Sequence, residues 1–239
     1  MKLTIIETGL PPEALREAWP GYPDMFRDLL TPHLPDWQFE TISVATGDPL
    51  VDPSTLDATL ITGAAAGVYD DEPWMAPLMD FIRWSAASNV PQIGICFGHQ
   101  AIAQAFGAQV RKSDKGWGIG RHVYDLAHKP SWMTDDPGAS FAIGVSHQDQ
   151  VETLPQGAEL VGTNNFCPYA ALNYPAAPAI SFQGHPEYSA DFSCALYGIR
   201  KGTRIAADLV EAAEDSFAAP LDNDLVGKWI ANFLKATTT

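Results

Sequence analysis

Hydrophobic residues in the first hundred positions follow two different periods along the chain. Short apolar or alternating runs are typical of strands, and they fall at residues 2–7, 37–44, 58–62 and 93–95. Apolar residues at helical spacing predict helices at residues 24–30, 74–87 and 100–106, the first with Asp24 as its N-cap. Strands that alternate with helices favour an open, mostly parallel sheet covered by helices.

The second half of the chain is richer in short strands. Runs separated by Gly, Pro, Asn and Asp fall at residues 108–111, 120–126, 141–145, 159–162, 169–172 and 180–182. We expect these runs to form a small antiparallel extension of the main sheet, and helices to follow at 189–201, 203–217 and 221–234. No repeat or linker interrupts the sequence. The predicted fold is therefore α/β, an open, mostly parallel sheet flanked by helices, in a single domain over residues 1–239.

The charge balance narrows the class of partner. Fourteen Lys and Arg residues against twenty-nine Asp and Glu residues give a formal net charge of −15. A negative field of this size argues against nucleic acid or an anionic membrane as a partner. Five of the basic residues lie in the segment 111–129, which we expect to be a solvated face (Arg111, Lys112, Lys115, Arg121 and Lys129).

Cysteine usage and hydropathy indicate a compartment. The three cysteines, at positions 96, 167 and 194, cannot all pair and form no CxxC motif, which is typical of a reducing cytoplasm. The apolar run at the N-terminus is too short for a signal peptide, and no apolar stretch reaches about 18 residues. We expect a soluble cytoplasmic protein.

The segment around Cys96 has the pattern of a nucleophile elbow. An apolar run ends at Ile95, small residues stand two before and two after Cys96, and a helical pattern follows at once. A sharp turn from strand to helix needs small residues at these positions, because bulky ones would clash with the strand or the helix. The turn also aims the positive end of the helix at the thiol, which favours the thiolate.

A second motif supplies the base that such a cysteine needs. Gly184-His185-Pro186-Glu187 directly follows the apolar run 179–183, so its side chains are also expected at the carboxyl end of a strand. His185 would act as general base toward Cys96 and then as general acid toward the leaving amine. Glu187 would turn back to hold the imidazole tautomer, as the acid of a catalytic triad does.

Together these motifs resemble the class I (triad-type) glutamine amidotransferases, and most of all their stand-alone, GMP synthase-like members. The likeness rests on Gly94-Ile-Cys96-Phe-Gly98-His-Gln100 and Gly184-His185-Pro186-Glu187, with further matches at 22–26, 62–63, 68–70 and 146–149. The resemblance implies a flavodoxin-like open sheet. It also implies cleavage of a γ-glutamyl amide through a γ-glutamyl thioester.

Residue roles follow from the same resemblance. It implies that Cys96 is the nucleophile, His185 the base and Glu187 the orienting acid. Its oxyanion hole would use backbone N–H groups of Phe97 and of the turn at Gly63 and Ala64. The substrate contacts it implies are Gln100, Ser146, His147 and Gln148.

Two stretches depart from the family pattern. After Gly63 many members have a further Gly and a Pro, whereas this chain has Ala64-Ala65-Ala66-Gly67, so Ala64 can present its N–H only if its φ lies in an allowed region. The segment 114–120 lacks the glutamate that often precedes Ile-Gly in relatives. The first departure bears on the oxyanion hole and the second on the specificity of the loop, and neither bears on the triad.

The expected activity is hydrolysis of a small-molecule γ-glutamyl amide, either glutamine or a γ-glutamyl amine or peptide. No phosphate-binding loop is present, so glutamine-derived ammonia would pass to a separate synthase subunit, and no cofactor is expected. A zinc site of His99, His147, His185 and Glu187 lacks the spacing of a known metal motif, so no metal is expected either. The alternatives are a regulatory subunit that binds a γ-glutamyl metabolite and a cysteine peptidase on a similar elbow.

Overall fold

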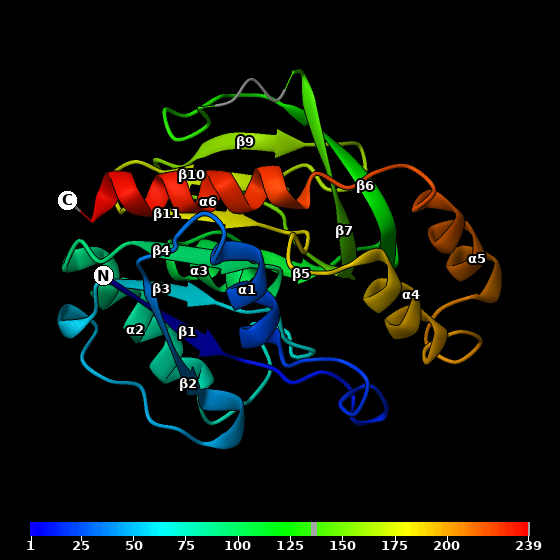
Figure 1. Ribbon diagram of the computed structural model, residues 1–239, viewed down its shortest axis with the longest axis horizontal. Coiled ribbons are helices and arrows are strands. Elements are labelled where there is room, and N and C mark those ends of the chain that lie inside the picture. Colours follow the sequence, from blue (N-terminus) through cyan, green and yellow to red (C-terminus); the bar gives the residue numbers. More distant parts are fainter. Residues whose placement is uncertain (135–137, 239) are drawn as a thin grey trace.

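A nine-stranded mixed sheet runs through the computed structural model, which describes residues 1–134 and 138–238 (Figure 1). The strand order is β2-β1-β3-β4-β11-β10-β9-β6-β7. The parallel strands are β1 (Lys2–Glu7), β2 (Gln38–Ser43), β3 (Ala58–Ile61), β4 (Gln92–Ile95) and β11 (Ala179–Phe182). The antiparallel strands are β6 (Gly118–Leu126), β7 (Ser140–His147), β9 (Glu159–Thr163) and β10 (Ala171–Tyr174).

Helices cover both faces of this sheet. On one face lie α1 (Tyr22–Leu30) and α6 (Asn223–Thr237), and on the other lie α2 (Met75–Ala87) and α3 (Phe97–Ala105). Helices α4 (Ala190–Gly198) and α5 (Ala207–Ser216) pack at the end of the sheet formed by β6 and β7 (Figure 1). No helix within the described ranges is long and apolar enough to cross a membrane.

The strands at the centre are buried on both faces, as parallel strands between two layers of helices must be. Leu60 of β3 is buried beneath α1 and α6, whereas the next residue, Ile61, is buried beneath α2 and α3. Among the described residues, the largest side chain that is fully buried is that of Trp229 on α6. These apolar layers hold the carboxyl ends of the central strands at fixed positions.

The structure confirms the predicted fold class and corrects several details. The antiparallel strands continue the main sheet, and a separate two-stranded sheet pairs β5 (Val110–Lys112) with β8 (Asp149–Val151), a strand that the sequence pattern did not predict. The prediction of Asp24 as an N-cap is wrong, because α1 begins at Tyr22 after Gly21. A proline in the first helical turn needs no N–H partner, so Pro23 fits there, and Asp24 faces the positive helix end.

Four neighbouring strands end at the same edge of the sheet. Strands β1, β3, β4 and β11 are adjacent and parallel, and each is followed by a residue of interest: Thr8, Gly63, Cys96 and His185. Ligand sites of open α/β sheets lie outside the carboxyl ends of the strands. The sheet therefore gathers these four residues at one place.

Candidate active site

Cys96 occupies a strained turn between β4 and α3. It has φ 53° and ψ −101°, and it is the N-cap residue of α3. A residue with a side chain and a positive φ costs about 1–3 kcal/mol, so such strain is retained where the surrounding structure enforces it. Here the Cys96 N–H donates to the carbonyl of Phe182 at 2.8 Å, which ties the turn to β11. The thiol is thereby placed at the positive end of a helix.

The glycines on either side of Cys96 are required by close backbone contacts. A Cβ atom on Gly94 would lie 2.5 Å from the carbonyl oxygen of Gly98. A Cβ atom on Gly98 would lie 2.2 Å from the carbonyl oxygen of Ile61, on the neighbouring strand. Neither position can hold a larger residue without movement of backbone, which gives the physical reason for the small residues of the elbow pattern.

His185 and Glu187 form a buried pair. Nδ1 of His185 lies 2.7 Å from Oε1 of Glu187, and the two side chains are 3% and 1% exposed. The imidazole ring stacks on Tyr188 with 3.9 Å between centroids. Burial lowers the pKa of His185, but the charges of Glu187 and Cys96 and hydrogen bonds to both outweigh it and raise the pKa to about 10. The site thus favours an imidazolium beside Cys96.

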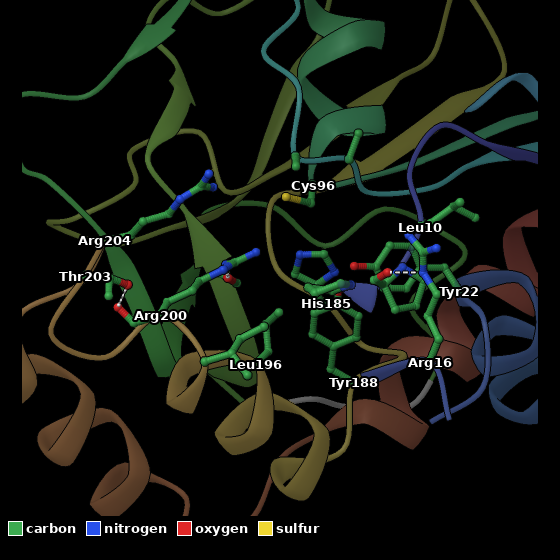
Figure 2. A pocket seen from close by; sticks show the side chains of 16 residues that line it. Leu10, Arg16, Tyr22, Cys96, His185, Tyr188, Leu196, Arg200, Thr203 and Arg204 are labelled. Atoms are coloured by element: carbon green, nitrogen blue, oxygen red, sulfur yellow. Dashed lines mark hydrogen bonds between the residues drawn. The ribbon is translucent and has the colours of Figure 1, made fainter. Parts of the chain in front are cut away.

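Gly63 shows how closely the two motifs meet. A Cβ atom at position 63 would lie 2.9 Å from Cε1 of His185 and 3.6 Å from Cβ of Cys96. Figure 2 shows the thiol of Cys96 above the ring of His185 at the head of a cavity. The structure therefore brings Cys96, His185, Glu187 and Gly63 together.

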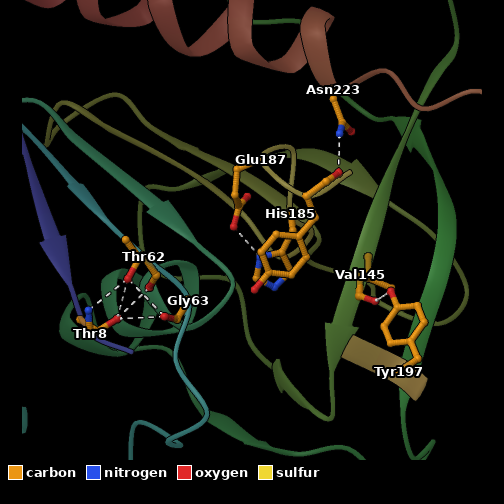
Figure 3. Close-up of polar contacts among 9 residues, drawn as sticks. Thr8, Thr62, Gly63, Val145, His185, Glu187, Tyr197 and Asn223 are labelled. Carbon is orange, nitrogen blue, oxygen red and sulfur yellow. Dashed lines mark hydrogen bonds and ion pairs between the residues drawn. The ribbon is translucent and has the colours of Figure 1, made fainter. Parts of the chain in front are cut away.

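The peptide that joins Gly63 to Ala64 is held in one orientation. The hydroxyls of Thr62 and Thr8 donate to the Gly63 carbonyl at 3.2 and 3.4 Å, and the two threonines also bond to each other (Figure 3). Because a trans peptide points its N–H opposite to its C=O, this fixes the N–H of Ala64. Among described residues other than glycine, a positive φ occurs at Asn89 and Cys96, so Ala64 meets the φ condition that its side chain imposes.

The first N–H groups of α3 differ in their partners. The Gly98 N–H donates to the Thr62 carbonyl at 3.2 Å. Phe97 is the first residue of α3, a position at which the N–H has no partner within the helix.

The cavity at Cys96 has two lobes that meet at the thiol. The His185 lobe has a volume of about 360 Å³ and is lined by His185, Tyr22 and Tyr188 among others. The Gln100 lobe has a volume of about 500 Å³ and is lined by Gln100 and the segment 146–149 among others. His185 lines only the first lobe. The residues that line both lobes are Ala64, Ala65, Cys96, Ser146, Arg200 and Arg204.

The four predicted substrate contacts all line the Gln100 lobe. Nε2 of Gln100 donates to the Asp149 carbonyl at 2.9 Å and to Oε1 of Gln183 at 3.1 Å, so its amide is fixed. Ser146 accepts a hydrogen bond from Arg200 at 2.9 Å. Nδ1 of His147 lies 3.0 Å from the Asp149 carbonyl, and burial lowers its pKa to about 3. A neutral His147 can offer Nε2 as a donor or acceptor, and Gln148 completes the wall of the lobe.

The other residues singled out in the sequence have different surroundings. His99 is fully buried with Nδ1 at 2.7 Å from the Ser181 hydroxyl, and burial lowers its pKa to about 3. In the described ranges no three His, Cys, Asp or Glu side chains are grouped so that they could hold a metal ion. Of the basic segment 111–129, Lys112 lines the Gln100 lobe, while Arg111 pairs with Asp114 and Glu152 on the surface.

Several cavity residues could not be found from local motifs. Arg16 lies in the loop after β1, and Arg200 and Arg204 lie just beyond α4, yet all three line the His185 lobe (Figure 2). The four-residue spacing of Arg200 and Arg204 is a weak signal, because surface helices carry such pairs routinely. Trp117, which lies near loop signals, lines the Gln100 lobe and stacks beneath the Arg200 guanidinium at 5.5 Å.

Comparison with known proteins assigns the family. The chain is 28% identical to gamma-glutamyl peptidase 4 of Arabidopsis thaliana over 75% of this chain and 72% of that protein. It is 29% identical to a GMP synthase (glutamine-hydrolyzing) of Thermosipho melanesiensis over 54% of this chain and 24% of that protein. The crystal structure of a glutamine amidotransferase from Methylobacillus flagellatus superimposes with a TM-score of 0.77 at 23% identity, covering 99% of this chain and 95% of that one.

The family model of the glutamine amidotransferase class-I domain matches residues 39–192. This range is more than half of the chain, and it includes Cys96, His185 and Glu187. The chain therefore belongs to the class I glutamine amidotransferase family.

Proposed function

We propose that residues 1–239 act as a single domain that hydrolyses the γ-amide bond of a γ-glutamyl compound, with Cys96 as the nucleophile. The observation that carries this proposal is the strained position of Cys96 at the N-terminus of α3, beside a His185–Glu187 pair joined at 2.7 Å. A thiol at a helix N-terminus and next to an imidazolium is activated as a thiolate. Family membership supports amide hydrolysis in general.

In the proposed reaction, Sγ of Cys96 attacks the γ-carbonyl carbon, and the oxygen becomes an oxyanion between the N–H groups of Phe97 and Ala64. The carbon–nitrogen bond then breaks, and the leaving nitrogen takes the proton of His185. Water, deprotonated by the neutral imidazole, attacks the γ-glutamyl thioester and releases glutamate and the free thiol. Glu187 holds the ring in place throughout, as its contact with Nδ1 requires.

The Gln100 lobe is the proposed seat of the glutamyl end of the substrate. Besides Gln100 and the segment 146–148, its charged lining residues are Asp70, Asp149, Lys112, Arg200 and Arg204. A free α-amino acid end carries one positive and one negative group, and this lobe offers charges of both signs. The Gln100 lobe therefore suits the α-amino and α-carboxylate groups.

The fate of the nitrogen defines two routes. The similarity to gamma-glutamyl peptidase 4 supports release of an amine or amino acid, and the similarity to a GMP synthase supports ammonia transfer to a separate synthase subunit. The match to the GMP synthase covers 24% of that protein. We place the reaction in the cytoplasm, since all three cysteines are free.

The test is turnover of glutamine and of a panel of γ-glutamyl amines and peptides, followed by release of glutamate. Cys96→Ser should lower kcat/KM by at least about 1000-fold, as loss of a nucleophile does in triad enzymes. Cys194→Ser is the matched control, because Cys194 lies on α4, is partly buried and does not line either lobe. It should keep the wild-type rate.

Labelling with a glutamine-like electrophile separates the proposal from its alternatives. The proposal expects covalent modification at Cys96 together with glutamate release. A regulatory subunit would bind γ-glutamyl compounds without turnover and without modification. A cysteine peptidase would cleave α-peptides and leave γ-glutamyl bonds intact, and either result would overturn the proposal.

A further inference from the structure

The His185 lobe lies on the side of the thiol from which the leaving group must depart. His185 protonates the leaving nitrogen in the proposed reaction, and it lines this lobe and not the Gln100 lobe. The lobe has a volume of about 360 Å³. Ammonia is about the size of a water molecule, which takes roughly 30 Å³ of liquid, so the space is far larger than glutamine requires.

The charge of this lobe is of one sign. Arg16, Arg200 and Arg204 line it, and no Asp or Glu is among its lining residues. Within residues 1–134 and 138–238, none of these three guanidinium groups lies at ion-pair distance from a carboxylate. In a chain of net charge −15, three of its seven arginines are thus gathered without acidic partners. Unpaired guanidinium groups in a cavity are suited to a carboxylate or a phosphate.

The arginines come from two segments and are held by other contacts. Nε of Arg16 donates to the Pro11 carbonyl at 2.7 Å, which leaves its terminal nitrogens for a ligand. Arg200 donates to the Ser146 hydroxyl at 2.9 Å and lies over the ring of Trp117. Figure 2 shows Arg16 on one side of His185, and Arg200 and Arg204 on the other. A group that leaves from His185 would therefore pass between cationic side chains.

The other lobe makes the contrast clear. The Gln100 lobe carries Asp70 and Asp149 together with Lys112, Arg200 and Arg204, so it has both signs of charge and suits an α-amino acid end. Arg200 and Arg204 line both lobes, whereas the His185 lobe has no acidic lining residue. A zwitterionic group bound in the Gln100 lobe would not contact Arg16, because Arg16 lines only the His185 lobe. Arg16 is therefore left to the leaving group, and Arg200 and Arg204 stand where they can contact it from the boundary between the two lobes.

We propose that the substrate of this chain carries a carboxylate on its leaving amine, as a γ-glutamyl amino acid or short γ-glutamyl peptide does, and that Arg16, Arg200 and Arg204 bind that carboxylate. This inference rests on the proposed function. The thiolate of Cys96 forms a bond to the carbonyl carbon of the γ-glutamyl amide, the carbon–nitrogen bond breaks, and the nitrogen takes the proton of His185. The amino acid leaves with its carboxylate still bound to arginine, and water then releases glutamate from the thioester.

The experiment compares γ-glutamylalanine with γ-glutamylalaninamide, which has the same shape and lacks the carboxylate. Wild-type kcat/KM should be at least about tenfold higher for the acid, because hydrogen bonds between charged groups contribute more than neutral ones. The double variant Arg16→Gln/Arg204→Gln should lose most of that preference. Arg83→Gln is the matched control, since Arg83 lies on α2 in an exposed pair with Asp80, and it should keep the preference.

Equal kcat/KM for acid and amide, or an unchanged preference in the double variant, would overturn the inference. A γ-glutamyl derivative of 2-aminoethyl phosphate hydrolysed faster than γ-glutamylalanine would also overturn the choice of carboxylate. Binding of both alanine compounds to Cys96→Ala separates this inference from the proposed function. A stronger affinity for the acid supports the arginine subsite even if the wild type shows no turnover, and equal affinities refute it.

Discussion

Gly63 is the residue at which the turn after β3 comes closest to the His185–Glu187 pair. Its missing side chain leaves the space that Cε1 of His185 occupies, at 2.9 Å from where a Cβ would stand. The ring cannot retreat freely, because it stacks on Tyr188 and is bonded to Glu187. One added methyl group must therefore move either the turn or the imidazole.

We predict that Gly63→Ala lowers kcat/KM for γ-glutamyl substrates by about 10- to 100-fold, because a displacement of about 1 Å in a catalytic group can cost about 100-fold. Thermal unfolding should show that the variant remains folded. Gly198→Ala is the control, since a Cβ there meets nothing within 4 Å, and it should retain full activity. Full activity of Gly63→Ala would contradict this prediction, because it would show that the added methyl group displaces neither the turn nor the imidazole.

Among the elements, α4 is positioned by one hydroxyl group. Tyr197 on α4 donates to the Val145 carbonyl of β7 at 2.6 Å and accepts the Gly120 N–H of β6 at 3.1 Å (Figure 3). The helix ends near Arg200, which in turn bonds to Ser146 on β7. Tyr197 thus fixes the helix end from which the cationic side of the His185 lobe is built.

We predict that Tyr197→Phe lowers the free energy of unfolding in urea by about 1–3 kcal/mol, the cost of leaving buried backbone groups without partners. Tyr124→Phe is the matched control. Both tyrosines are fully buried, but the hydroxyl of Tyr124 has no hydrogen-bond partner within the described residues. Its removal should leave the unfolding free energy unchanged or slightly higher. Equal losses in the two variants would contradict the role given to the Tyr197 hydroxyl.

The sequence predicted those elements and residues whose signals are local. Gly94, Cys96 and Gly98 stand within one strand-to-helix turn, so their spacing is visible in the sequence. His185 and Glu187 bond to each other across a single residue, so this pair is also visible as a short motif. Strand β8 was missed because three residues beside another strand carry too little periodicity. The arginines of the His185 lobe could not be predicted, since they meet only through the path of the loop after β1 and the turn after α4.

At the scale of the whole molecule, buried histidines make stability depend on pH in two opposite ways. Burial lowers the pKa of His99 and His147 to about 3 and that of His122 to about 4. Below pH 6.5, the unfolded chain therefore takes up protons that the folded chain does not, and stability falls. His185 has a raised pKa, of about 10, so the stability it contributes is complete below pH 6.5 and is lost as pH rises toward 10.

We predict that the unfolding free energy falls steeply between pH 6.5 and pH 4, each buried neutral histidine adding a slope of about 1.4 kcal/mol per pH unit. His99→Asn should reduce the slope by about one such increment, measured by urea unfolding at several pH values. His128→Asn, which changes a half-exposed histidine, should leave the slope as it is. An identical slope in wild type and His99→Asn would contradict the neutral state of His99.

The convergence of four strand ends at the candidate active site also bears on how that site assembles during folding. Thr8, Gly63, Cys96 and His185 are far apart in the chain and become neighbours only when β1, β3, β4 and β11 have paired. Pairings between distant segments form slowly, because each must close a long loop of chain first. A nascent or partly refolded chain therefore carries all four residues without an assembled site. If the proposed function holds, hydrolysis of a γ-glutamyl amide will report completion of the sheet, rather than the presence of any one of its parts.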